Sequence, residues 1–228
     1  MKKHIHIIII ASVLSVFATS SWAAAELKTD KQKLSYSLGA YFSQGVSKQN
    51  IDLDVPAFLQ AVEDVLNHSE LKLDQNEMQQ VLTAYQQKLI EERNASASTN
   101  KAAGEKFLAE NKKKDGVVTL DSGLQYKVLK KGDGPKPKSD SKVKVNYEGT
   151  HIDGRVFDSS YERGEPITLS LGQVIKGWQE ALPLMNVGSK YQFYIPADLA
   201  YGDHGAGKSI EPNETLIFDI ELLGIEDK

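Results

Sequence analysis

The sequence predicts an α+β protein in which a helical part precedes a sheet. Up to residue 115 the apolar residues recur with the 3.6-residue period of helices, and from residue 116 they alternate with the two-residue period of strands. A single helical stripe around Trp178 interrupts the strands. We therefore expect a helical N-terminal domain, a long connecting helix and a C-terminal antiparallel sheet wrapped around one short helix.

Residues 1–25 are expected to direct export and not to join the fold. Two lysines near the start precede an apolar run over residues 5–18, and small residues close the segment. This order is typical of a secretory signal peptide, cleaved here after Ala23 or Ala25, and the run is too short to span a membrane. An uncleaved anchor is the alternative. The expected destination is the periplasm, and onward transfer to the outer membrane or cell surface stays open.

Composition excludes several classes of function. Loss of the signal removes two lysines and moves the net charge from −4 to −6, which argues against a nucleic-acid partner. The chain has no cysteine, which excludes disulfides, thiolate catalysis and cysteine metal sites. No histidine pair beyond the signal has metal-ligand spacing, and neither a nucleophile elbow nor a phosphate loop is present. We expect no cofactor and no metal.

Residues 26–90 predict three short amphipathic helices. Thr29 and Asp30, Asp54, and Asp74 are suitable caps for the three helices in turn, and Glu77 completes a capping box in the third helix. The apolar stripes are Leu34, Leu38, Tyr41, Phe42 and Val46; Phe58, Leu59, Val62, Val65 and Leu66; and Met78, Val81, Leu82, Tyr85 and Leu89. A bundle this small buries such stripes poorly, so we interpret it as a homodimerisation domain. A closed monomeric bundle is the alternative.

Residues 91–115 predict a connector between the two domains. The stretch 94–100 carries no large apolar residue and is rich in Ser, Thr and Asn, which are poor helix formers. A helix that is polar all round is either a solvated spacer or unstable. We expect a long helix here and leave its continuity through 94–100 open.

Residues 116–228 predict the sheet domain. Its strands are expected at 124–129, 143–147, 167–169, 191–195 and 216–220. The one helix is expected to run from Val174 to a stop at Pro183, with Trp178 on its inward face. Gly177 lies within this pattern and costs about 1 kcal/mol relative to alanine. We therefore expect another part of the chain to approach it closely.

Several motifs in this half resemble those of the FKBP-type peptidyl-prolyl isomerases. They are Tyr147-Glu148-Gly149, Gly154-Arg155-Val156-Phe157-Asp158-Ser159-Ser160, Val174-Ile175-Lys176-Gly177-Trp178, Leu199-Ala200-Tyr201-Gly202 and the run from Pro212 to Leu222. The helical part, with Asp30-Lys31-Gln32-Lys33-Leu34-Ser35-Tyr36-Ser37-Leu38-Gly39, is similar to the macrophage infectivity potentiator (Mip) group of bacterial FKBPs. The resemblance spans nearly all of the chain after the signal.

The resemblance implies a prolyl-binding pocket and a role for each residue that matches. The implied catalytic residues are Tyr147, Phe157, Asp158, Tyr201 and Phe218. The implied substrate-binding residues are Arg163, Val174, Ile175, Trp178 and Ile210. In this scheme Trp178 forms the floor and Asp158 is the charged rim residue, paired with Arg163. The Ile175 N–H and the Tyr201 hydroxyl donate to substrate carbonyls.

The implied activity is cis-trans isomerisation of X-Pro bonds in exported proteins, by desolvating and twisting the amide. The implied partners are proline-containing unfolded or exported polypeptides, a second copy of the chain bound through residues 26–90, and a macrolide inhibitor of the FK506 or rapamycin type. Ala206 stands where many members carry a pocket-edge histidine, so macrolide affinity stays open. The alternative hypothesis is a periplasmic chaperone or prolyl-peptide binding module with little catalytic role.

Overall fold

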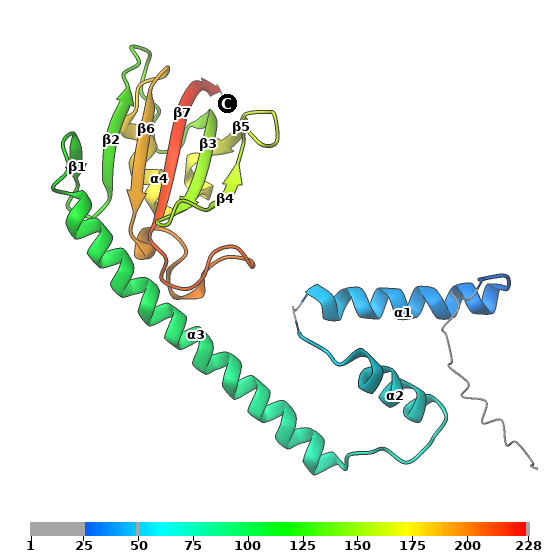
Figure 1. Cartoon of the computed structure of the whole chain (residues 1–228). Helices are drawn as coiled ribbons and strands as arrows, with labels where there is room; N and C mark the ends of the chain where they lie inside the picture. Colours follow the sequence, from blue (N-terminus) through cyan, green and yellow to red (C-terminus); the bar gives the residue numbers. More distant parts are fainter. Residues whose placement is uncertain (1–25, 49–50, 227–228) are drawn as a thin grey trace, which may run out of the picture. The chain divides into compact units, whose positions relative to one another are not determined.

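The computed structural model describes residues 26–48 and 51–226 (Figure 1). The predicted signal peptide lies outside the described residues. The chain divides into two compact units, Met1–Lys72 and Leu73–Lys228, which are described in turn. Within the described part of the chain, every helix is too short or too polar to span a bilayer.

The first unit contains the helices α1 (Asp30–Lys48) and α2 (Val55–Leu66). Asp54 caps α2, as predicted, because its side chain accepts a hydrogen bond of 2.9 Å from the Ala57 N–H. Phe42 of α1 stacks on Phe58 of α2 with ring centroids 6.0 Å apart. This contact joins the two helices, but it covers little of their apolar surface.

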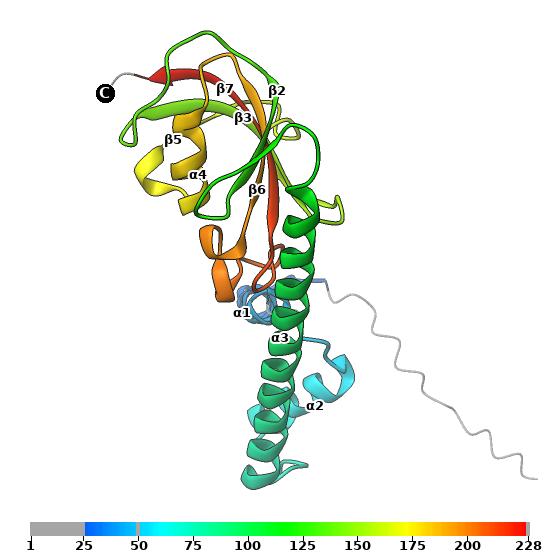
Figure 2. The same ribbon diagram turned by 90° about the vertical axis from the view of Figure 1, so that its left-hand side faces the viewer.

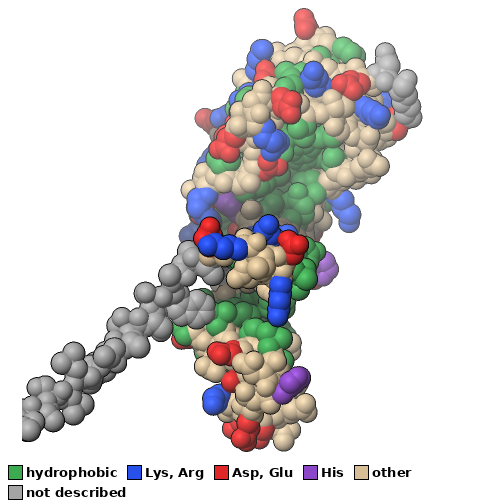
Figure 3. All heavy atoms as spheres, turned by 90° about the vertical axis from the view of Figure 1, so that its right-hand side faces the viewer, with side chains coloured by type: hydrophobic (Ala, Val, Ile, Leu, Met, Phe, Trp, Pro, Cys, Tyr) green, Lys and Arg blue, Asp and Glu red, His purple; other side chains and the backbone are tan. Residues whose placement is uncertain are grey.

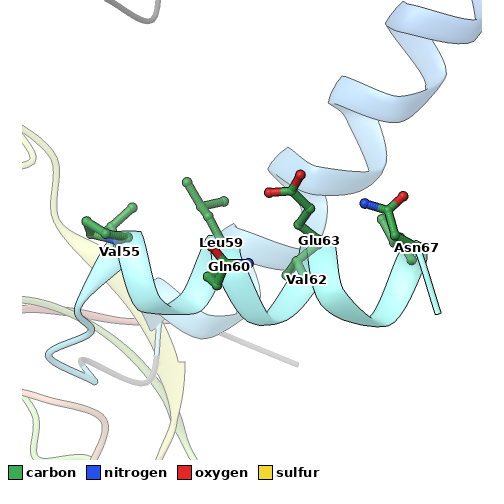
Figure 4. Close-up of a pocket in the computed structure, with 8 residues that line it drawn as sticks. Val55, Leu59, Gln60, Val62, Glu63 and Asn67 are labelled. Carbon is green, nitrogen blue, oxygen red and sulfur yellow. The ribbon is translucent and has the colours of Figure 1, made fainter. Parts of the chain in front are cut away.

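Much of the apolar surface of this unit is exposed in the single chain. Helix α1 has no buried residue, and Leu38 and Tyr41 are 63% and 81% exposed. Hydrophobic side chains are visible at the surface between charged ones (Figure 3). A hollow of about 540 Å³ follows one face of α2, where Leu59 and Glu63 project to the same side (Figure 4).

The second unit begins with α3 (Gln75–Asn111), one unbroken helix of 37 residues. The predicted capping box is present: the Glu77 N–H donates to Asp74 at 2.9 Å, and the Asp74 N–H donates to Glu77 at 2.8 Å. The helix passes through residue 90 and through 94–100 without interruption. The third expected helix and the expected connector are therefore a single element.

The rest of the second unit is an antiparallel sheet that wraps around one short helix, as predicted (Figures 1 and 2). The strands are β1 (Val117–Thr119), β2 (Gln125–Lys130), β3 (Lys142–His151), β4 (Val156–Ser159), β5 (Ile167–Ser170), β6 (Lys190–Ile195) and β7 (Leu216–Glu226). Their order is β1-β2-β6-β7-β3-β4, and β5 also pairs with β3. The helix α4 (Lys176–Ala181) buries Trp178 and Ala181 against the sheet.

The prediction that this helix begins at Val174 is wrong. Val174 and Ile175 are extended, with ψ angles of 174° and 150°, and the helix starts at Lys176 with Ile175 as its N-cap. Pro183 does not follow the helix directly, because it lies in the 3₁₀ turn η2 (Leu182–Leu184). Proline is tolerated there because the first turn of a helix leaves its N–H groups unpaired.

Gly177 is required by close packing, as the sequence predicted. A Cβ atom at this position would lie 2.4 Å from the Ile195 Cγ2 atom and 3.2 Å from the Leu199 carbonyl oxygen. At Gly177 the backbone of α4 therefore packs directly against β6 and the turn that follows it.

We expect Gly177→Ala to lower the free energy of unfolding by about 1–3 kcal/mol, because the added methyl group overpacks a close contact. The matched control is Gly172→Ala, where nothing lies within 4 Å of the added carbon. Urea unfolding followed by Trp178 fluorescence measures both variants in a protein that begins at residue 26. Equal stability of the two variants would contradict the packing explanation.

Candidate active site

A cavity of about 340 Å³ opens between α4 and the strands of the second unit. Aromatic side chains from separate elements form its walls: Tyr147 from β3, Phe157 from β4, Trp178 from α4 and Phe218 from β7. The remaining lining residues are Asp158, Ile167, Gln173, Val174, Ile175 and Tyr201. The cavity is thus assembled from segments that are far apart in the sequence.

Edge-to-face contacts hold the aromatic walls in place. Trp178 contacts Tyr147 and Phe218 with centroid distances of 5.3 Å in both cases and interplanar angles of 81° and 85°. Phe157 contacts Phe218 in the same manner, at 5.5 Å and 85°. Such geometry places the positive edge of one ring on the negative face of the next. Tyr147, Trp178 and Phe218 therefore belong to the core, and Phe157 packs against it.

Strand alternation and register explain how these rings meet. Along β3 the buried positions alternate, and Tyr147 and Gly149 both face the core. Gly149 pairs with Asp158 on β4 and with Phe218 on β7. A Cβ atom at Gly149 would lie 2.6 Å from Phe157 and 2.9 Å from Phe218, so only glycine lets the two rings approach.

The cavity has one charged cluster at its rim. The Asp158 carboxylate accepts hydrogen bonds from the Tyr147 hydroxyl and from the Arg163 guanidinium. Arg163 also donates to the Tyr147 oxygen at 2.8 Å, and its guanidinium carbon lies 5.4 Å from the centre of the Tyr147 ring. The three side chains form a closed set in which the carboxylate is neutralised by its neighbours.

The cluster shifts two ionisation equilibria in opposite directions. Burial, and then the hydrogen bond to Asp158, raise the pKa of Tyr147. Burial also acts to raise the pKa of Asp158, but the hydrogen bonds from Tyr147 and Arg163 outweigh it and hold that pKa below its ordinary value. Asp158 is therefore charged and Tyr147 neutral at physiological pH.

Two further groups could bind a ligand in the cavity. Tyr201 follows the turn η3 (Ala197–Leu199), and the residue is 38% exposed. Burial, and then the charge of Asp158, raise its pKa, so its hydroxyl stays a donor at neutral pH. The Ile175 N–H precedes α4 and forms no backbone hydrogen bond with any described residue.

The structure brings together all of the predicted site residues except Ile210. Arg163 is not in the lining but joins the rim through its hydrogen bonds. Ile210 is buried in the core and pairs with Ala206 through backbone hydrogen bonds of 2.8 and 3.1 Å, outside the lining of the cavity. The roles of all these residues stay predictions.

The sequence reasoning missed Ile167 and Gln173, which also line the cavity. The sequence predicts Ile167 only as part of a strand, because β5 is too short for alternation to show which face is buried. Gln173 lies in the 3₁₀ turn η1 (Leu171–Gln173) and carries no periodic signal.

Nothing in the described residues suggests a metal centre, since His, Asp and Glu side chains nowhere gather in a group able to hold an ion. The cavity instead offers an apolar concave surface, a neutralised carboxylate and hydrogen-bond donors. This arrangement suits an uncharged ring next to an amide.

Comparison with protein families identifies the class. The model described as "FKBP-type peptidyl-prolyl cis-trans isomerase" matches residues 134–223, and the model "Domain amino terminal to FKBP-type peptidyl-prolyl isomerase" matches residues 31–128. The chain belongs to the FKBP-type peptidyl-prolyl cis-trans isomerases. The predicted enzyme class is confirmed, and the alternative of a binding module with little catalytic role is not favoured.

Individual relatives place the chain near the Mip and FkpA proteins. It is 42% identical to "Outer membrane protein MIP" of Legionella longbeachae, a match that covers 96% of this chain and 97% of the relative. It is 46% identical to the FKBP-type peptidyl-prolyl cis-trans isomerase FkpA of Aeromonas hydrophila, covering 89% and 79%. The crystal structure of FkpA from Escherichia coli superposes with a TM-score of 0.62 at 37% identity, covering 88% of this chain and 99% of that chain.

Proposed function

We propose that the cavity between α4 and the sheet catalyses cis-trans exchange of X-Pro bonds. The observation that carries this assignment is the closely packed aromatic enclosure of Trp178, Phe218, Tyr147 and Phe157, with the charge of Asp158 paired with Arg163 at its rim. An apolar ring fits such an enclosure. The charge of Asp158 stays occupied by its neighbours and does not oppose entry of that ring.

The chemistry needs rotation of a bond and no bond breaking. The barrier of about 18–20 kcal/mol is the amide resonance lost when the C–N bond twists. A planar amide has a larger dipole than a twisted one, so removal from water raises its free energy relative to the transition state. Interactions that are stronger in the twisted state accelerate the reaction further.

We assign the donors to Tyr201 and Ile175. The Tyr201 hydroxyl and the Ile175 N–H lie at the cavity and are available to substrate carbonyl oxygens. Donors held in advance stabilise the twisted geometry without reorganising during the reaction. Val174, Ile175 and Phe157 offer apolar contact to the residue before proline, which favours a hydrophobic side chain there.

The same cavity is proposed to accept a macrolide of the FK506 or rapamycin type. The support is the family to which the chain belongs and the aromatic walls, which would contact an apolar ring of the macrolide as they contact proline. The physiological partners in this proposal are proline-containing unfolded or exported polypeptides.

Catalysis can be tested with an Ala-Leu-Pro-type peptide. We expect Tyr201→Phe to lower kcat/KM about three- to tenfold, the effect of one neutral hydrogen bond, and Asp158→Leu to lower it further because it releases Tyr147 and Arg163. The matched control is Tyr161→Phe, an exposed tyrosine outside the cavity lining, with unchanged activity. A wild-type rate equal to the uncatalysed rate would refute the assignment.

We further propose that the protein is a homodimer joined through residues 26–90. The support is the exposed apolar stripe of α1, because monomeric proteins rarely expose large contiguous apolar patches. For location we propose the periplasm, supported by the predicted signal peptide and by a relative named as an outer membrane protein.

Light scattering tests the dimer. We expect the protein that begins at residue 26 to have twice the chain mass, and Leu38→Glu to halve that mass by placing an unpaired charge in the interface. Gln44→Glu adds the same charge to an exposed polar position of α1 and should leave the mass unchanged. A monomeric wild-type protein at micromolar concentration would contradict the proposal.

A further inference from the structure

The loop between Tyr201 and β7 lies beside the middle of α3 (Figures 1 and 2). It begins in the 3₁₀ turn η4 (Gly202–His204). The Arg93 guanidinium of α3 donates to the carbonyl oxygens of Asp203 and His204, at 3.2 and 3.3 Å. One long side chain thus holds two consecutive backbone carbonyls of the loop.

A second set of contacts, made by Ser96 and Asn100, lies about one to two helical turns further along α3. The Glu211 carboxylate accepts hydrogen bonds from the Ser96 hydroxyl and from the Asn100 amide nitrogen, the latter at 3.2 Å. Asn100 also donates to the Pro212 carbonyl at 3.0 Å. The hydrogen bond from Ser96, and then the one from Asn100, hold the pKa of Glu211 below its ordinary value, as expected for a carboxylate that accepts several hydrogen bonds.

A third contact lies where the loop enters β7. A Cβ atom on Gly104 would be 2.3 Å from the Thr215 hydroxyl oxygen, and both residues are buried. The helix backbone therefore packs directly against the start of the strand. Contacts between α3 and the loop extend from Arg93 to Gly104.

The loop needs such support because several of its residues hold backbone conformations that are costly to fix. Gly202, Gly205, Gly207 and Asn213 all have positive φ angles, and glycine loses more conformational freedom on folding than any other residue. Within the loop, the described backbone bonds are the pair between Ala206 and Ile210 and the 2.8 Å bond from the Asn213 N–H to the Gly202 carbonyl. Much of the polar anchoring of the loop therefore comes from α3.

We propose that Arg93, Ser96 and Asn100 are positioning residues of the isomerase site. By holding the loop directly after Tyr201, they keep the Tyr201 hydroxyl over the cavity before substrate arrives. A donor held in advance costs less to order in the transition state. The proposal rests on the proposed role of the cavity, and it adds to the site a helix segment that does not line the cavity.

The test compares Arg93→Ala and Asn100→Ala with the matched control Asn94→Ala, an exposed asparagine of the same helix with no described contact to the loop. We expect each test variant to lower kcat about three- to tenfold with little change in KM, and the control to match the wild type. Arg93→Lys, which keeps a cationic donor, should recover part of the lost rate.

Amide hydrogen exchange of residues 202–211 and of Asn213 supplies the structural readout in the same variants. We expect exchange there to accelerate in Arg93→Ala and Asn100→Ala, while the strands stay as protected as in the wild type. Faster loop exchange with unchanged kcat would overturn the proposal and leave α3 a purely structural support. Unchanged exchange would overturn it as well. An inactive wild-type protein would instead refute the proposed function, whatever the exchange result.

A double-mutant cycle separates the Asn100 contact from a general effect on the helix. Asn100→Ala and Glu211→Gln alter the same hydrogen bond, so their effects on kcat should be less than additive. Asn94→Ala combined with Glu211→Gln should be additive. Additive effects in both pairs would contradict a specific contact between Asn100 and Glu211.

Discussion

The packing of Trp178 against Tyr147 and Phe218 is the contact on which the second unit depends. These three rings are only 3–6% exposed, so they belong to the hydrophobic core, and they also line the cavity. The core and the proposed binding site therefore share these three side chains. A site built from packed core residues changes shape little on binding, which reduces the cost of ordering it. The same arrangement means that a substitution at any of these rings affects both stability and activity.

Glycine makes this arrangement possible at two positions. Gly149 allows Phe157 and Phe218 to meet over β3, and Gly177 allows α4 to rest on Ile195. At each position a methyl group would force two elements apart. The walls of the cavity therefore depend on the aromatic side chains and also on the absence of side chains at Gly149 and Gly177.

The sequence was informative wherever a local pattern carried the structure. The capping box at Asp74 and the close approach at Gly177 followed from local rules. The motifs that carry the family resemblance contain most of the residues that line the cavity. The predicted helix start at Val174 is wrong because Val174 and Ile175 belong to an extended segment whose side chains also pack against the core. Their apolar character therefore continued the helical spacing beyond the first residue of the helix. Sequence periodicity alone cannot tell an apolar residue buried in a helix from one buried in a short extended segment next to it.

The continuity of α3 through residues 94–100 had no local signal in the sequence. Residues 94–100 have poor helix propensity, yet Ser96 and Asn100 gain partners in a loop more than a hundred residues away. Tertiary contacts of this kind override propensity, and no pattern within the helix reveals them. The same physical reason explains why the link between α3 and the loop after Tyr201 could be found only in the structure.

In the proposed mechanism, the cavity accelerates rotation by its apolar walls and fixed donors, without a group that changes its protonation state during catalysis. The pKa of Asp158 lies below its ordinary range, and those of Tyr147 and Tyr201 lie above theirs. Asp158 therefore loses its charge, and the contribution of that charge to stability, only as the pH falls through its depressed pKa. The tyrosines lose their protons only above their ordinary pKa of about 10. The decisive measurement is kcat/KM for a prolyl peptide between about pH 5.5 and pH 9. We expect a flat profile, and a bell-shaped or steeply sloping profile would contradict the proposed mechanism.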